Sequence, residues 1–584
     1  MRRWRIIALA TTVIAVAGGL LWLDLANRGL AWRALWSLTG EEAPLAQVRG
    51  GVEWLGNLTR AMPDTEPLAP VNHVHDVPYG VNTFLQLEAD PAVRERSIQM
   101  IADAGIGWIR QQFPWEDIEI HARGDFDDRR NVEAIGVVSA WDKYDQIVGL
   151  ADAYGVRIQA RVDTPPAWTR ADPDEGTLAP PDDWEDYYTF LRITAERYRG
   201  RITHYQIWNE PNIYPEWGNN PVDPEGYAAV LCRAYAVLKA VDPAIVVHAA
   251  ALSPTVALTG RDLSDLIYFQ RMVQAGVSGC FDVMSVQGYG FFSGPTDQRL
   301  RAMTLNFARV QYIRDIMVAS GDSDVPIWIS EAGWNPVDEP DVPDGIPGKE
   351  NFGAVTQAQA AEYMPLAYAR AAREWNWVGA IMIWHWKRPD ESERNLPFYY
   401  FRMVEPDFTP MPIYAAMREY IAAEPPLLYS GAHQANHRFI ERIMSRIAPP
   451  PPDDGLEAAE GAQFGTARRG ELFQFTTFGT HTLVRWRGAP GESLEVRESS
   501  DTSAALTLQP RPDADGWTTS IVYGSLIAEE HTFILQGSVN LLLDSVIVYD
   551  RTGLQVIPIA AAVGMVIAFE IALIAVLALR RRHV

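Results

Sequence analysis

Short apolar runs alternate with longer amphipathic stretches through the middle of the chain, from about residue 75 to residue 424. This alternation is typical of strand–helix units built around a parallel sheet. Helices are expected between most of the strands, with examples at Pro91–Ala104, Trp141–Tyr154, Trp184–Tyr198, Pro224–Val241 and Ala358–Glu374. The pattern predicts eight strands, at Tyr79–Leu87, Gly107–Gln112, Arg157–Val162, His204–Trp208, Ile245–Ala250, Val283–Gln287, Ile327–Ser330 and Gly379–Trp384.

Eight strand–helix units within roughly 350 residues predict an α/β fold of the (β/α)8 type, the TIM barrel, over residues 75–424. The side chains that do chemistry in this fold lie where the strands end, at the C-terminal face of the barrel. The residues that follow each predicted strand are therefore the first candidates for a functional site.

The pattern changes after the predicted barrel. Residues 425–460 are expected to form a helical and proline-rich linker, which includes the stiff run Pro449–Pro452. Over residues 461–553, short runs such as Leu472–Phe478 and Thr482–Arg487 alternate between apolar and polar positions. This alternation predicts a small C-terminal β domain.

Both ends of the chain are long apolar runs, Ile6–Leu23 and Leu554–Leu579, and each is near the length that crosses a bilayer. We therefore expect an N-terminal transmembrane anchor over residues 1–24 and a C-terminal transmembrane helix over residues 554–579. Three arginines lie outside each run. By the positive-inside rule they place both termini in the cytoplasm and the rest of the chain on the extracytoplasmic side of the cell membrane.

Two points about the N-terminal region stay open. The first apolar run could instead be a signal peptide that is removed after export. Residues 25–74 are expected to form a juxtamembrane connector, in which the stretch Leu30–Leu38, with Trp32 and Trp36, is a candidate for the membrane interface.

Composition narrows the function further. The 584 residues are 48% hydrophobic and 21% charged, which excludes a disordered chain. The net charge of −24 argues against nucleic acid as a partner. Only two cysteines are present, Cys232 and Cys280, so a disulfide-dense scaffold and a four-cysteine zinc site are excluded. Whether those two cysteines pair cannot be read from the sequence.

Two predicted strand ends carry a glutamate. The fourth strand runs into Asn209-Glu210-Pro211, and the seventh into Ser330-Glu331-Ala332-Gly333. Hydrolysis of a glycoside with retention needs two carboxyl groups about 5–5.5 Å apart, one protonated and one ionised. A negative neighbour raises the pKa of the carboxyl group that must stay protonated.

On these two motifs, residues 75–424 resemble the clan A glycoside hydrolases, the retaining (β/α)8 group, with a family 39-like or cellulase-like branch as the nearest likeness. The resemblance implies that Glu210 is the general acid/base and Glu331 the nucleophile. It also implies that Asn209 hydrogen-bonds the 2-hydroxyl of the sugar.

Four further residues are substrate-binding candidates by the same resemblance: Arg110 and Tyr289, which contact the nucleophile in this clan, and Trp384 and Trp386, where the clan stacks a tryptophan under the sugar. Some branches have a histidine two residues before the tyrosine, where this chain has Gln287. Each residue also has a structural interpretation, as a salt-bridged acid, a surface cation or a core aromatic. The same choice between sugar platform and loop packing applies to Trp115, Trp168, Trp217 and Trp334.

The sequence therefore predicts a membrane-anchored retaining glycoside hydrolase that cleaves an extracytoplasmic, β-linked oligo- or polysaccharide. No metal or organic cofactor is expected, because two carboxyl groups and water suffice for the reaction. Two alternatives remain: a glycan-binding protein without catalysis, and a component of exopolysaccharide assembly that retains the barrel and contacts other assembly proteins.

Overall fold

The computed structural model describes residues 21–57, 59–74, 77–444, 465–467, 471–499, 505–537 and 541–550, together with positions 12, 15, 16, 18 and 19. The expected C-terminal transmembrane helix, and most of the expected N-terminal anchor, lie outside the described residues. Within the described part, no helix has both the length and the hydropathy that crossing a bilayer requires.

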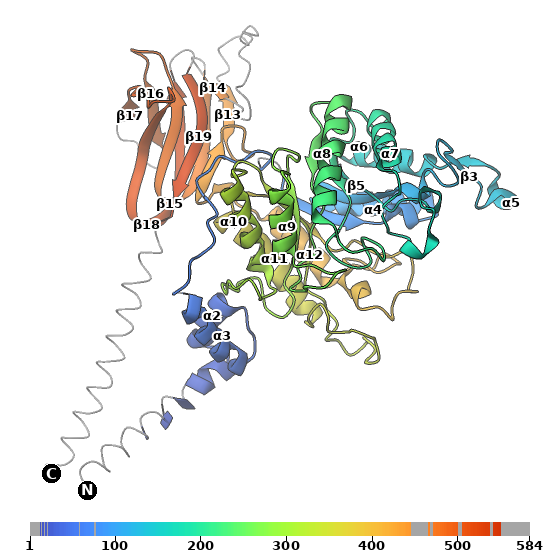
Figure 1. The fold of residues 1–584 in the computed structure, drawn as a ribbon. Helices are drawn as coiled ribbons and strands as arrows, with labels where there is room; N and C mark the ends of the chain where they lie inside the picture. The colour runs from blue at the N-terminus through green and yellow to red at the C-terminus, as the bar shows by residue number, and fades with distance from the viewer. Residues whose placement is uncertain are drawn as a thin grey trace. The chain divides into compact units, whose positions relative to one another are not determined.

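The chain forms two compact units. Unit 1 comprises residues 1–66, 76–372 and 377–424, and unit 2 comprises residues 67–75, 373–376 and 425–584. Unit 1 contains the barrel and unit 2 is a β domain (Figure 1).

Unit 1 is an eight-stranded parallel barrel, as the sequence predicts. The strands are β1 (Tyr79–Thr83), β2 (Trp108–Pro114), β5 (Arg157–Asp163), β6 (His204–Ile207), β7 (Val246–His248), β8 (Met284–Tyr289), β9 (Ile327–Gly333) and β10 (Val378–Ile383). Their order is β7-β6-β5-β2-β1-β10-β9-β8, and each overlaps one of the eight predicted runs, with ends that differ by up to four residues. Single bridges from His248 to Val283 and from Leu252 to Val286 join β7 to β8, so the sheet is nearly closed.

One helix follows each strand and packs outside the barrel (Figure 1). Aspartates at positions 90, 183 and 223 cap the first turns of three of these helices by accepting backbone N–H bonds, and Gly155 and Gly321 end two of them in the left-handed region. The helices are α4 (Pro91–Asp103), α6 (Asp142–Tyr154), α7 (Trp184–Arg197), α8 (Pro224–Val241), α9 (Asp265–Gln274), α10 (Val310–Ser320), α11 (Gln357–Glu374) and α12 (Pro412–Ala422). A small excursion after β2 holds β3 (Asp127–Asp128), α5 (Val132–Ile135) and β4 (Val138–Ser139).

Aromatic side chains fill the N-terminal part of the barrel interior. The rings of Trp108 and Trp328 lie 4.9 Å apart, and His204 stacks on Trp328 at 5.2 Å. His248 meets the same tryptophan edge-on at 4.8 Å. This packed layer closes one end of the barrel, so polar groups further along the strands face the other end.

Strand β9 contains one extra residue between Ile329 and Ala332. Against β8, Ile329 pairs with Val286 while Glu331 pairs with Gln287; against β10 the register shifts at the same place. Side chains alternate along a strand, so the inward-facing Trp328 would otherwise be followed inward by Ser330. The bulge instead brings Glu331 to the interior face.

The disulfide between Cys232 of α8 and Cys280, in the loop before β8, ties two parts of unit 1 together. The sequence had left this pairing open.

A helical hairpin precedes the barrel within unit 1. Helices α2 (Leu30–Thr39) and α3 (Pro44–Asn57) pack on the loop after β8, where Arg299 forms ion pairs with Glu41 at 2.7 Å and Glu53 at 3.3 Å. Trp32 is only 8% exposed. Trp32 therefore packs within the protein, and the suggestion that this residue lies in a membrane interface is wrong.

Unit 2 is a sheet of nine strands in which all pairings but one are antiparallel. Its core is aromatic and aliphatic, with Phe473, Trp486 and Phe533 fully buried. The described part of residues 425–460, expected as a helical linker, instead forms β11, β12 and β13, because these residues pair with the long strands β15 and β19. The strands are β11 (Leu427–Leu428), β12 (Gly431–Gln434), β13 (Glu441–Met444), β14 (Gly465–Ala467), β15 (Glu471–Arg487), β16 (Leu494–Glu498), β17 (Leu506–Leu508), β18 (Thr518–Gly537) and β19 (Leu541–Tyr549).

Candidate active site

Glu331, inward-facing because of the β9 bulge, is held by two donors. Nη1 of Arg110 donates to its Oε1 at 2.8 Å, and the hydroxyl of Tyr289 donates to its Oε2 at 2.7 Å. The carboxylate is 4% exposed. An ion pair and a charge-assisted hydrogen bond thus fix the positions of both oxygens of this buried side chain.

Arg110 is the centre of a buried polar layer that lies next to the aromatic layer of the barrel interior. Arg110 lies in β2 and is 2% exposed. Besides Glu331, its guanidinium donates hydrogen bonds to the side chains of Asn82 at 2.7 Å, Gln206 at 2.9 Å and Asn209 at 2.6 Å. Four neutral or anionic acceptors fix the guanidinium plane. Arg110 is therefore an interior residue that joins β1, β6 and β9, and the interpretation as a surface cation is excluded.

Glu210 stands at the end of β6 in a different environment. Its backbone and that of Trp208 have positive φ angles of 40° and 68°, a conformation that costs free energy outside glycine and recurs at functional sites. The side chain is half-buried and accepts hydrogen bonds from two neutral donors, Nε2 of Gln287 at 3.3 Å and the hydroxyl of Ser253. Burial, and next the negative charge of Glu331, raise the pKa of Glu210 to about 8.

A third carboxyl group, Glu216, lies beside this pair in the loop after β6. Burial is the largest influence on its pKa, which rises to about 7, although the positive charge of Arg161 opposes the rise. Glu216 accepts a hydrogen bond from the Asn209 side chain, and its charge also raises the pKa of Glu210. Arg161 in turn pairs with Asp163 at the end of β5, at 2.5 Å.

The two tryptophans predicted at the end of the eighth strand have different surroundings. Trp384 is half-buried and meets Phe84 edge-on at 5.4 Å. Trp386 is 1% exposed and packs against Tyr414 of α12 at 5.9 Å. The indole of Trp386 has no open face for a sugar ring, so this candidate is corrected to a core residue.

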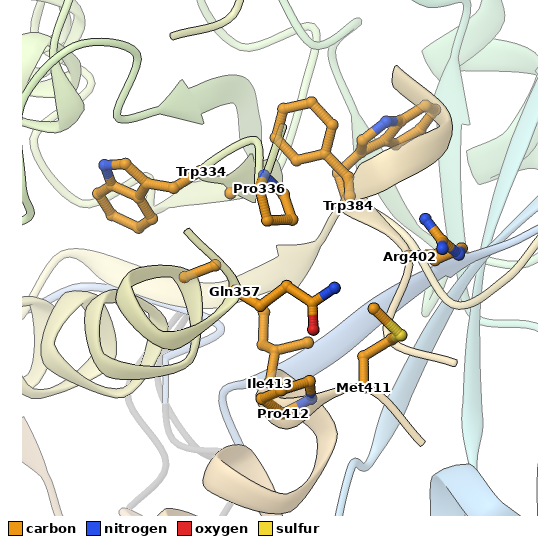
Figure 2. Close-up of a pocket in the computed structure, with 11 residues that line it drawn as sticks. Trp334, Pro336, Gln357, Trp384, Arg402, Met411, Pro412 and Ile413 are labelled. Carbon is orange, nitrogen blue, oxygen red and sulfur yellow. The ribbon is translucent and has the colours of Figure 1, made fainter. Parts of the chain in front are cut away.

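A small hollow lies beside Trp384, between the end of β9 and the first turns of α11 and α12. Figure 2 shows Trp384 and Pro336 on one side of it and Met411 and Pro412 on the other. Neither Glu210 nor Glu331 lines this hollow.

Most of the loop tryptophans pack in the protein. Trp115, Trp217 and Trp334 are at most 5% exposed, and only Trp168 among these four is half-buried. Within the described residues no group of three histidine, cysteine or acidic side chains is arranged to hold a metal ion.

The structure thus brings together five of the seven residues singled out from the sequence: Arg110, Asn209, Glu210, Tyr289 and Glu331. Sequence reasoning missed Asn82, Gln206 and Glu216. The first two could have been found from their places late in their strands: Asn82 of β1 is in register with Arg110 of β2, and Gln206 lies on β6, two strands away from β2. Glu216 follows a strand end by nine residues, and nothing in its sequence context distinguishes it from a surface acid.

The solved structures similar to this chain include several glycoside hydrolases, in agreement with the resemblance stated above. A family 39 enzyme from Bacteroides cellulosilyticus WH2 is 16% identical, with a TM-score of 0.45 over 80% of this chain and 82% of that one. A family 39 enzyme from Xanthomonas axonopodis pv. citri is 14% identical, with a TM-score of 0.43 over 84% and 99% of the two chains. A monomeric β-xylosidase from Caulobacter crescentus CB15 is 14% identical, with a TM-score of 0.42 over 82% and 99%.

Neither a protein-family model nor a curated protein sequence matches the chain. At the identities and TM-scores above, the site's own geometry has to support any functional conclusion.

Proposed function

We propose that this protein is a retaining glycoside hydrolase in which Glu331 is the nucleophile and Glu210 the general acid/base. The observation that supports the proposal is that two interacting carboxyl groups at the mouth of one barrel have different hydrogen-bond donors and different electrostatic environments. Glu331 has a guanidinium and a phenol hydroxyl as donors, while Glu210 has only neutral donors, an amide and a serine hydroxyl, and a pKa raised to about 8.

The chemistry follows from these environments. Oε of Glu331 attacks the anomeric carbon while the glycosidic C–O bond breaks and the proton of Glu210 passes to the leaving oxygen. The product of this step is a glycosyl ester on Glu331. Glu210, now ionised, takes a proton from water as the water oxygen attacks the same carbon, and the ester bond breaks to restore both residues.

Asn209 is the proposed partner of the sugar's 2-hydroxyl. Its amide oxygen accepts from Arg110 and one amide hydrogen is donated to Glu216, so a second amide hydrogen remains for substrate. Trp384 is the proposed aromatic platform, because its ring is half-buried in this region and Trp386 is not accessible.

The test is hydrolysis of a panel of aryl β-glycosides and polysaccharides by the purified chain, with the anomer of the first-formed product read by NMR. We expect turnover with retention, and none by Glu331→Gln. Asp322→Asn is the matched control, since Asp322 is a buried acid between α10 and β9, away from the strand ends. Glycan binding without turnover in the unmodified chain would instead favour a non-catalytic binding or exopolysaccharide-assembly role.

We also propose that residues 1–24 and 554–579 hold the protein in the cell membrane, with both termini cytoplasmic and the barrel outside. The flanking arginines support this topology, and the Cys232–Cys280 disulfide suits an oxidising compartment. Proteinase K added to intact cells should digest the barrel but leave tags on either terminus protected. Protection of the barrel would contradict the topology.

A further inference from the structure

Helix α3 turns its apolar side outward. Four residues spaced by three, four and three positions are exposed: Leu45 by 72%, Val48 by 44%, Val52 by 67% and Leu55 by 56%. We call these four residues the α3 stripe. A helix on a water-exposed surface normally presents such a stripe to the protein core.

The inward side of α3 is polar or small. Gln47 is fully buried and donates to the carbonyl of Trp32 at 3.2 Å, and Asn57 is 4% exposed and donates to the carbonyl of Gln298 at 3.4 Å. Gly50 is buried against Thr39. Polar and small residues of α3 therefore make its contacts with the rest of unit 1, and the α3 stripe faces away from those contacts.

The α3 stripe is tied to the end of the N-terminal apolar run. Asp24 follows that run directly, and its carboxylate accepts the backbone N–H of Trp32 at 3.1 Å. Trp32 in turn donates from its indole to the carbonyl of Glu42, two residues before α3, at 3.0 Å. The beginning of α3 is therefore two hydrogen bonds away from Asp24.

Unit 2 has an independent feature of the same kind. Gly479 of β15 pairs with Glu529 of β18, whereas His481 pairs with Gly524, so residues 525–528 bulge out opposite the single residue Thr480. In this β18 bulge Leu526 is 89% exposed and Ile527 is 60% exposed. Large aliphatic side chains at the tip of a bulge gain nothing from packing in their own unit.

The β18 bulge lies next to the start of the C-terminal apolar run. His481 pairs with Gly524 on one side and with Tyr549 on the other, so about 10 Å separate the bulge from the end of β19. Only five residue steps lead from Tyr549 to Leu554, which span at most about 18 Å. Each unit thus has exposed apolar side chains close to where its chain continues into an apolar terminal run.

We propose that the α3 stripe and the β18 bulge lie on the outer surface of the lipid bilayer, where their side chains enter the headgroup boundary. This proposal depends on the membrane anchoring proposed above. A second copy of the chain is a poorer occupant, because α3 has 14 residues, two heptads, and an interhelical seam needs more. Arg49, 82% exposed at its side chain among the stripe residues, suits a headgroup layer in which long cationic side chains reach water.

The test uses the full chain in phosphatidylcholine vesicles. Both native cysteines are in the disulfide, so Val52→Cys or Leu526→Cys supplies the only thiol for an environment-sensitive fluorophore. Ile135→Cys is the matched control, because Ile135 of α5 is an equally exposed aliphatic residue, at 62%. We expect lipids with a shallow nitroxide to reduce emission at positions 52 and 526 by about twofold, with no change at 135.

The outcomes separate the two proposals. Protein that does not float with the vesicles contradicts the anchoring itself. Protein that floats, but whose labels at 52 and 526 respond as at 135, overturns the lipid contact and leaves the anchoring intact. Self-quenching that grows with protein density, without quenching by lipid, would identify a second copy as the occupant and also overturn the proposal.

Discussion

Glu210 and Glu331 are the same residue type at two strand ends of one barrel, yet their surroundings are opposite. Glu331 is buried with an arginine and a tyrosine as donors, whereas Glu210 is half-buried, accepts hydrogen bonds from neutral side chains and lies next to two other acids. The comparison teaches that the division of labour between two carboxyl groups is set by the neighbours that the fold supplies.

Loss of Glu331 should have the largest effect. Glu331→Ala removes the attacking oxygen, so we expect kcat to fall on the order of 10⁴-fold or more, as for removal of other nucleophiles. Azide can occupy the vacated space, and we expect it to restore turnover with inversion of the product. A variant that stays fully active, with an unchanged melting temperature, would contradict the assignment.

Loss of the proton donor should cost less and depend on the substrate. For Glu210→Gln we expect a drop of about 10²–10⁴-fold with poor leaving groups, the usual contribution of general acid catalysis, and a much smaller drop with dinitrophenyl glycosides. In the unmodified chain the rate should decline as the pH rises past about 8, because Glu210 loses its proton there. An equal drop in rate with good and poor leaving groups would contradict the role of Glu210 as the general acid.

Removal of one donor to Glu331 tests how far its environment matters. Tyr289→Phe deletes a hydrogen bond to a charged group, worth about 1.5–3 kcal/mol, so we expect kcat to fall about 10–150-fold with KM little changed. Tyr205→Phe is the matched control, since this buried tyrosine of β6 has no hydroxyl partner within the described structure. Similar losses in both variants would indicate a packing effect.

The smallest expected effect concerns Glu216. Its negative charge raises the pKa of Glu210, so Glu216→Gln should move the basic limb of the pH–rate profile to lower pH. The rate on the plateau should change only a few-fold, because Glu216 is not one of the two reacting groups. A limb that does not move would show that Glu216 and Glu210 are not electrostatically coupled.

The fold of unit 1 could be predicted because eight apolar runs and the helices between them are local patterns. The carboxyl pair could be predicted because strand ends share one face of a barrel. The burial of Trp386 could not be predicted. Trp384 and Trp386 are two positions apart and of the same type, and only the elements that pack on them make one accessible and the other buried. The strands β11 to β13 were also missed, because short strands depend on distant partners such as β15.

The extra residue in β9 gives the site an unexpected vulnerability. The bulge, and not the order of residues, turns Glu331 inward: in a β9 of the same length without the bulge, Ser330 would take the interior position and Glu331 would point toward the surrounding helices. Substitutions that straighten β9 could therefore inactivate a descendant of this protein that keeps every residue of its site.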